Sequence, residues 1–154
     1  MKTSSVTQAV LKNIATFGFI GYLPYAPGTW GSAVGLVFVA ALKPSSIAHM
    51  ALIVAGFMLG TAASTVAEKA IGEKDSGHII IDEFIGFLVS VFSVPHTYGY
   101  LAAAFILFRL FDILKPVPIA KMEKTLSKGL GIMTDDLAAG LYVNVILQIW
   151  IKIF

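Results

Sequence analysis

The sequence has no cysteine, a single arginine and few charged side chains. Without cysteine there is no disulfide, no thiolate zinc site and no cysteine nucleophile. The single arginine, Arg109, argues against membrane acid phosphatases that grip phosphate with several arginines. Charged residues make up 13% of the 154 positions, about half of the roughly 25% usual in soluble domains. This composition is poorly suited to a surface that faces water on all sides.

Motifs of several large enzyme classes are absent as well. The chain contains no Gly-x-Ser-x-Gly, no His-Glu-x-x-His, no Gly-x-Gly-x-x-Gly and no Gly-Lys-Ser/Thr loop. The net charge of +2 is small and the basic residues form no run, so we expect no nucleic-acid partner. The N-terminal residues lack a signal-peptide pattern, so we expect the apolar segments themselves to direct the chain to a membrane.

Apolar residues form 57% of the chain, and the mean hydropathy of +0.84 suits a bilayer. Residues 5–16 predict a short interfacial helix, and the glycine- and proline-rich residues 18–32 predict an irregular loop. Five apolar segments follow: Ser32–Leu42, Ile47–Ala63, Ile79–Val94, Tyr98–Leu114 and Leu137–Phe154. We expect residues 1–154 to form one all-α domain, a polytopic transmembrane bundle with four to five embedded helices. The first of the five segments is short, and it either crosses the bilayer or dips into it.

The lysines predict how such a bundle is oriented. Two lysines fall on one side of the membrane, Lys43 and Lys152. Eight fall on the other side, at the N-terminus and in the two long connections: Lys2, Lys12, Lys69, Lys74, Lys115, Lys121, Lys124 and Lys128. Positive charge is enriched in cytoplasmic connections, so this second side is predicted to be cytoplasmic, and the acidic residues described next lie on it or beside it.

Carboxylates interrupt three apolar stretches. Asp82 and Glu83 lie inside the third segment, where an ionised carboxylate is costly unless a cation, hydrogen bonds or protonation compensate it. Asp112 lies near the end of the fourth segment, and three-residue spacings place Arg109, Asp112 and Lys115 on one helical face. An interfacial salt bridge with headgroup contacts is an equally weighted interpretation of this triplet.

A third pair of acids, Asp135 and Asp136, follows the loop signal Gly129-Leu130-Gly131 and precedes the fifth segment. Helix capping by Thr134 or Asp135 is the simpler interpretation of this pair alone. Taken with the other acids, however, the pair completes a set of five carboxylates without a histidine or cysteine motif. Such an all-oxygen set suits a hard divalent cation, Mg²⁺ with Mn²⁺ as the alternative.

The stretch Pro27–Ser32 has the composition of a tight turn that opens a helix. Backbone N–H groups and hydroxyls at Gly28 and Thr29 are therefore candidates for binding a phosphate. A purely structural turn with Thr29 as the helix cap is the alternative, with similar weight.

Four stretches together resemble the phosphatidylglycerophosphatase A family of bacterial membrane phosphatases. They are Pro27–Ser32, Ile81–Gly86, Phe108–Pro116 with Pro118 and Ile119, and Gly129–Gly140. They occur in the family's order and at similar spacing. The resemblance implies Mg²⁺-dependent hydrolysis of the terminal phosphate of phosphatidylglycerophosphate, which yields phosphatidylglycerol in the inner membrane. It leaves the role of each acid open.

The resulting hypothesis is a multi-pass lipid phosphatase whose site faces the cytoplasm, with a phospholipid substrate. The predicted catalytic and metal-binding residues are Asp82, Glu83, Asp112, Asp135 and Asp136. The predicted phosphate contacts are Arg109, Lys115, Gly28 and Thr29. Asp82 or Asp136 is the expected general base, with an aspartyl-phosphate intermediate as an alternative. The rival hypotheses are a transporter or cation carrier that uses intramembrane carboxylates, and a non-enzymatic subunit.

Overall fold

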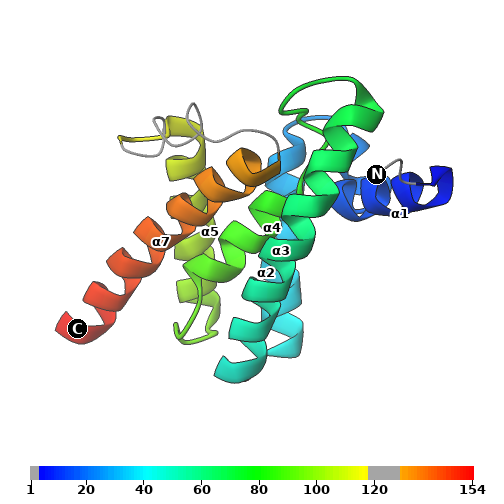
Figure 1. Ribbon diagram of the computed structural model, residues 1–154. Coiled ribbons are helices and arrows are strands. Elements are labelled where there is room, and N and C mark those ends of the chain that lie inside the picture. Colours follow the sequence, from blue (N-terminus) through cyan, green and yellow to red (C-terminus); the bar gives the residue numbers. More distant parts are fainter. Residues whose placement is uncertain (1–3, 118–128) are drawn as a thin grey trace.

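The computed structural model describes residues 4–117 and 129–154. Within these ranges the chain forms six α-helices, one 3₁₀-helix and no strand, which confirms the all-α prediction (Figure 1). The elements are α1 (Ser5–Thr16), η1 (Ile20–Tyr22), α2 (Pro27–Leu42), α3 (Ser46–Ile71), α4 (Ile81–Ser90), α5 (Tyr98–Leu114) and α7 (Gly129–Ile153). Pro118, Ile119, Lys2, Lys121, Lys124 and Lys128, which entered the sequence predictions, lie outside the described residues.

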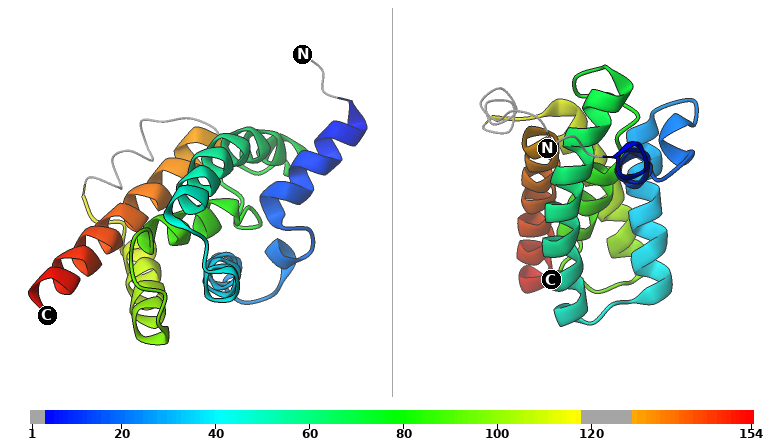
Figure 2. Two further views of the ribbon diagram at one scale, coloured as in Figure 1. Left: turned by 90° about the horizontal axis from the view of Figure 1, so that it is seen from below. Right: turned by 45° about the vertical axis from the view of Figure 1, so that its right-hand side comes forward.

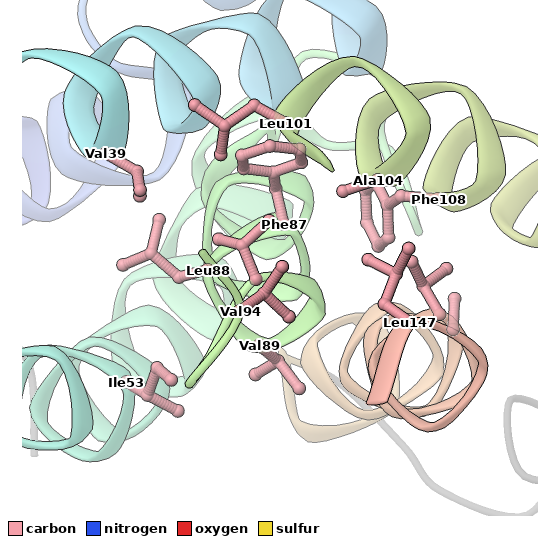
Figure 3. Close-up of a cluster of buried hydrophobic side chains, with 13 residues drawn as sticks. Val39, Ile53, Phe87, Leu88, Val89, Val94, Leu101, Ala104, Phe108 and Leu147 are labelled. Carbon is pink, nitrogen blue, oxygen red and sulfur yellow. The ribbon is translucent and has the colours of Figure 1, made fainter. Parts of the chain in front are cut away.

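The short helix α4 is the centre of the fold. It packs against α2, α3, α5 and α7, and eight of its ten residues are buried. Figure 3 shows Phe87, Leu88 and Val89 of α4 in the middle of the main hydrophobic cluster. Apolar side chains occupy more than half of its circumference, and Asp82, Glu83, Gly86 and Ser90 share the remaining side.

The prediction that Ile79–Val94 crosses the membrane as a helix is not confirmed. The helix within this segment, α4, has ten residues, and a helix of that length rises only about 15 Å, half of a hydrocarbon core of roughly 30 Å. The apolar residues on either side continue the chain as turns rather than as helix. Their hydrophobicity reflects burial inside the protein.

Two helices, α3 and α7, are long and apolar enough to cross a membrane, and α2 is a shorter apolar helix. Within the described ranges, length and composition therefore support two candidate spans. The four to five embedded helices expected from the sequence are not confirmed.

The other helix boundaries agree with the sequence predictions in some segments and differ in others. The helices predicted over residues 5–16 and Tyr98–Leu114 are confirmed. The prediction for residues 18–32 is wrong beyond Ala26, because α2 begins at Pro27, where proline suits the first helical position. The loop predicted at Gly129–Gly131 is also wrong, because α7 already begins at Gly129.

Glycines let α4 and α7 cross in direct backbone contact. A Cβ on Gly140 of α7 would overlap the carbonyl oxygen of Gly86, and a Cβ on Gly86 would lie 2.7 Å from the carbonyl oxygen of Asp136. Gly129 is used in the same way against α3, where a Cβ would overlap the carbonyl oxygen of Thr61. These glycines therefore serve helix packing, and they set the distance between the acids that α4 and α7 carry.

We expect Gly140→Ala to lower the free energy of unfolding by about 1–3 kcal/mol, because the added methyl must separate α4 from α7. Thermal unfolding in detergent measures this loss. Gly99→Ala is the matched control, since a Cβ on Gly99 of α5 meets nothing within 4 Å. The control is expected to be neutral or stabilising by up to about 1 kcal/mol. Equal stability of the two variants would contradict the glycine contact.

The two ends of the bundle differ in character. In Figure 1 the upper end holds the α3–α4 connection, the C-terminal end of α5 and the N-terminal end of α7. Helix α1 lies across this end rather than along the bundle (Figures 1 and 2). The lower end holds the α2–α3 and α4–α5 turns and the C-terminus of α7. Lys69 and Lys115 end helices at the upper end, and Lys43 and Lys152 do so at the lower end.

Candidate active site

Helix α4 presents the first two acids in its first turn. No side chain caps this helix, and Asp82 and Glu83 place negative charge at its N-terminal end, where the helix dipole favours it. The α4–α7 crossing then brings Asp136 beside them. One carboxylate oxygen from each of these three residues lies within 4.8 Å of the others. The structure therefore assembles acids from two segments that are far apart in the sequence.

Asp112 extends the group from α5. Its Oδ2 accepts a hydrogen bond of 2.6 Å from Nη1 of Arg109, one helical turn earlier. Asp112 also lies close enough to Asp136 for its charge to act on that carboxyl group. Asp112 therefore joins the arginine to the carboxylate group, and the predicted Arg109–Asp112 face exists.

Lys115 does not continue that face. It is the C-cap of α5 with a left-handed φ of 41°, and its Nζ forms an ion pair of 2.6 Å with Oδ2 of Asp135 on α7. Lys115 therefore forms its ion pair with Asp135 on another helix, and not with Asp112 on the face predicted from the sequence. Asp135 lies next to the other acids, since its charge acts on both Asp82 and Asp136.

Gly28 meets the site from the N-terminus of α2. A Cβ at this position would overlap Oε1 of Glu83 and would lie 3.1 Å from Nη1 of Arg109. No side chain caps α2, and its N-cap Ala26 has a left-handed φ of 53°. Thr29 follows in the same turn, but its N–H already donates to the carbonyl of Ala26, which leaves its hydroxyl as the group available to a ligand.

The carboxylates are buried with little compensation. Asp82, Asp135 and Asp136 are 9%, 6% and 3% exposed. Oδ1 of Asp82, Oε2 of Glu83 and Oδ2 of Asp136 are buried, and no donor in the described part of the chain reaches them. Burial, followed by the charge of Glu83, raises the pKa of Asp82 well above its usual range. Burial likewise raises the pKa of Glu83.

These features test whether the donor set fits a divalent cation. Removing a carboxylate from water without a partner costs several kcal/mol, and here each of the three clustered carboxylates has one such oxygen. A hard cation with oxygen ligands would satisfy them together. The donor set therefore fits the Mg²⁺ or Mn²⁺ that the sequence predicts.

Three of the five predicted acids, Asp82, Glu83 and Asp136, form the group, and the charges of Asp112 and Asp135 act on it. Of the predicted phosphate contacts, Gly28, Arg109 and Lys115 border these acids, and Thr29 follows Gly28 in the same turn. The sequence analysis missed Gly86 and Gly140, whose close contact sets the position of Asp136. A signal was available, because both glycines lie inside apolar helical segments. In a membrane protein, small residues on a helix let the backbones of two helices approach closely.

Comparisons with known proteins identify relatives of the chain. The family model for phosphatidylglycerophosphatase A matches residues 13–151. The chain is 36% identical over 136 residues to phosphatidylglycerophosphatase A of Haemophilus influenzae, covering 84% of this chain and 83% of that protein. It is 32% identical over 123 residues to phosphatidylglycerophosphatase A of Escherichia coli K12, covering 78% and 71% of the two chains.

A third relative carries a different name. A putative phosphatidylinositol-3-phosphatase of Bacteroides thetaiotaomicron is 34% identical over 138 residues, covering 84% of this chain and 86% of that protein. No solved structure matches the chain. The family match spans the described site from Gly28 to Asp136. The chain therefore belongs to the phosphatidylglycerophosphatase A family of phosphatases.

Proposed function

We propose that this phosphatase removes the terminal phosphate of phosphatidylglycerophosphate in a reaction that depends on Mg²⁺. The observation that carries the proposal is the set of three carboxylate oxygens within 4.8 Å, drawn from Asp82, Glu83 and Asp136. Two basic side chains, Arg109 and Lys115, border the same group. Carboxylates for a metal and cations for a phosphate are the two components that phosphate-ester hydrolysis requires.

Asp82, Glu83 and Asp136 would hold the ion, and Asp112 would complete its surroundings through Asp136. When bound, a divalent ion neutralises charge on phosphoryl oxygens and lowers the pKa of a bound water. The carboxylates contribute position, because α4 and α7 fix them relative to one another through direct backbone contact.

Arg109 is the proposed phosphate-binding residue. Its Nη1 is held by Asp112 at 2.6 Å, while its Nε is buried and no acceptor in the described part of the chain reaches it. A phosphoryl oxygen would satisfy this donor with a charge-assisted hydrogen bond. Gly28 keeps the approach open, because any side chain there would overlap Glu83. The hydroxyl of Thr29 and the ammonium group of Lys115 complete the proposed contacts.

Hydrolysis then needs a base for water. In the proposed step, the carboxylate of Asp82 or Asp136 takes a proton from water as the water oxygen attacks phosphorus. The bond between phosphorus and the glycerol oxygen breaks, and this oxygen receives a proton to become the hydroxyl of phosphatidylglycerol. An aspartyl-phosphate intermediate is the alternative, and trapping of the acyl phosphate by acid quench with ³²P-labelled substrate or by borohydride reduction would reveal it.

The proposed location is the cytoplasmic face of the bacterial inner membrane, in a multi-pass arrangement. Two candidate spans, α3 and α7, support membrane insertion. Lys69 and Lys115 lie at the end of the bundle that carries the acids, in keeping with the enrichment of positive charge on the cytoplasmic side. Cysteine scanning of the α2–α3 turn and the α3–α4 connection with an impermeant reagent in inverted vesicles tests this orientation.

Phosphate release from phosphatidylglycerophosphate by purified protein in detergent tests the proposed reaction. We expect release with Mg²⁺, loss of release after chelation by EDTA, and recovery when Mg²⁺ is returned. If no phosphate is released in any of these conditions, the proposed hydrolysis is contradicted and a cation carrier is favoured. Release that chelation does not affect would contradict the proposed role of the three carboxylates.

The relative from Bacteroides thetaiotaomicron supports a second candidate substrate, a phosphoinositide. The proposed contacts recognise a phosphate monoester, which a phosphatidylinositol 3-phosphate headgroup also carries. The same assay with this lipid as a competing substrate distinguishes the two. We expect a higher kcat/KM for phosphatidylglycerophosphate, and the reverse order would assign the phosphoinositide.

A further inference from the structure

An apolar groove separates the N-terminal half of α5 from the C-terminal half of α7. Its volume is about 470 Å³. The residues that line it include Tyr100, Ala103 and Leu107 of α5, and Ile146, Leu147 and Trp150 of α7. The two helices are inclined to one another, and the C-terminal end of α7 lies away from the lower end of α5 (Figures 1 and 2).

The groove opens to the outside of the bundle. Ile146 is 40% exposed and Trp150 is 54% exposed, although α7 is a candidate membrane span. In a bilayer such side chains meet hydrocarbon rather than water. The surroundings expected for this groove are therefore acyl chains.

The helix faces that line the groove lead toward the candidate active site. On α7, one face carries a row of residues three or four positions apart, which share that face: Asp135, Ala139, Tyr142, Ile146 and Trp150. On α5, a four-residue spacing similarly leads from Ala103 through Leu107 and Phe111 to Lys115. The Lys115–Asp135 ion pair joins the two helices at the upper end of these rows. Below it, Phe111 and Tyr142 stack with ring centroids 5.9 Å apart.

We propose that this groove holds an acyl chain of the phospholipid whose headgroup occupies the active site. This inference rests on the proposed function. At about 1.5 Å per residue, Leu107 lies roughly 12 Å and Ala103 roughly 18 Å below Lys115. These depths bracket the roughly 15 Å of hydrocarbon in one leaflet. A lipid held by Lys115 at its headgroup would therefore place one chain in the groove.

A second copy of the chain is the competing occupant. One turn of a helix, about 10–12 Å across and 5.4 Å long, fills roughly 400–600 Å³, so a groove of about 470 Å³ holds no more than a single turn. A flexible hydrocarbon chain is narrower and can lie along the groove. The helix faces that lead from the groove toward the Lys115–Asp135 ion pair also favour a ligand that is anchored at the active site.

Filling the groove tests the proposal. In Ala103→Trp, an indole would occupy the space between the helices, and Ile146→Trp would fill it from α7. Ile106→Trp is the matched control, because Ile106 lies outside the groove on the same helix and is 67% exposed. Phosphate release is measured with dioleoyl and with dihexanoyl phosphatidylglycerophosphate, alongside thermal unfolding and the oligomeric state of each variant.

We expect either groove variant to raise KM about tenfold for the long-chain substrate, because the indole removes packing contacts with the chain; this factor corresponds to about 1.4 kcal/mol. KM for the short-chain substrate and both KM values of the control should change less than twofold. An equal change in KM for both chain lengths, or no change in KM, would overturn the proposal that the groove binds an acyl chain. Conversion of a wild-type dimer to a monomer by both groove variants would assign a second copy instead and would also overturn it.

A binding measurement separates this proposal from the proposed reaction. Wild-type protein is mixed with vesicles that contain phosphatidylglycerol with a diazirine near the end of one acyl chain, and labelled peptides are identified. Labelling within residues 100–107 or 146–150, reduced by Ala103→Trp and not by Ile106→Trp, supports the groove even if no phosphate is released. Labelling spread evenly over the exposed helix surfaces would count against it.

Discussion

Asp136→Asn is expected to lower kcat/KM by about 100-fold or more, in the range seen when one group that stabilises transition-state charge is removed. Asp136 is the α7 member of the three-carboxylate group, and the charge of Asp112 also acts on it, so its loss affects both parts of the site. Asparagine has nearly the same shape, which confines the change to charge. Phosphate release at saturating Mg²⁺ measures the effect.

The same variant is expected to be more stable than the wild type in EDTA, because a buried negative charge has been removed from a group of like charges. Mg²⁺ should raise the melting temperature of the wild type, since a ligand that binds only the folded state stabilises it. It should raise that of Asp136→Asn much less. Reduced activity together with reduced stability and an unchanged response to Mg²⁺ would instead indicate a structural role for Asp136.

Gly28→Ala is expected to lower kcat/KM by about 10- to 100-fold, since displacing a catalytic group by about 1 Å has effects of that size. The new methyl overlaps Oε1 of Glu83 and lies 3.1 Å from Nη1 of Arg109, so the carboxylate or the guanidinium group must move. Gly77→Ala is the matched control, because a Cβ on Gly77 meets nothing within 4 Å. Phosphate release and thermal unfolding are measured for both variants.

The loss in Gly28→Ala should be specific to the site. We expect its melting temperature to fall only slightly, since the groups that must move lie at the end of the bundle rather than in the main hydrophobic cluster. The control should retain its activity within about twofold. Wild-type kcat/KM in Gly28→Ala would contradict the placement of α2 against the carboxylates.

The sequence predicted helix ends correctly where a capping residue or a proline marks them, and it predicted the site acids because they interrupt apolar segments. Helix α1 follows a serine cap, since the side chain of Ser4 accepts a hydrogen bond from the N–H of Thr7. Helix α5 begins directly after Thr97 and ends at Leu114, and its C-cap Lys115 precedes a proline. The acids stood out because carboxylates are costly among apolar residues. Their convergence could be predicted from that cost alone, without knowledge of the helix packing.

Other features depend on contacts that the sequence does not reveal. The extent of α4 was overestimated because residues buried in protein and residues facing lipid are equally apolar. Gly129 was interpreted as a loop signal, yet it packs against Thr61 inside the fold. The Lys115–Asp135 pair joins different helices, and only their packing selects it over the nearer Asp112.

The central claim is that Asp82, Glu83 and Asp136 bind a divalent cation together. Crystals of the protein soaked in Mn²⁺, measured at a wavelength where manganese scatters anomalously, test it most directly. We expect an anomalous peak among these three carboxylates in the wild type and a much weaker peak in Asp136→Asn. A peak elsewhere in the wild type, or an equally strong peak in the variant, would contradict the claim.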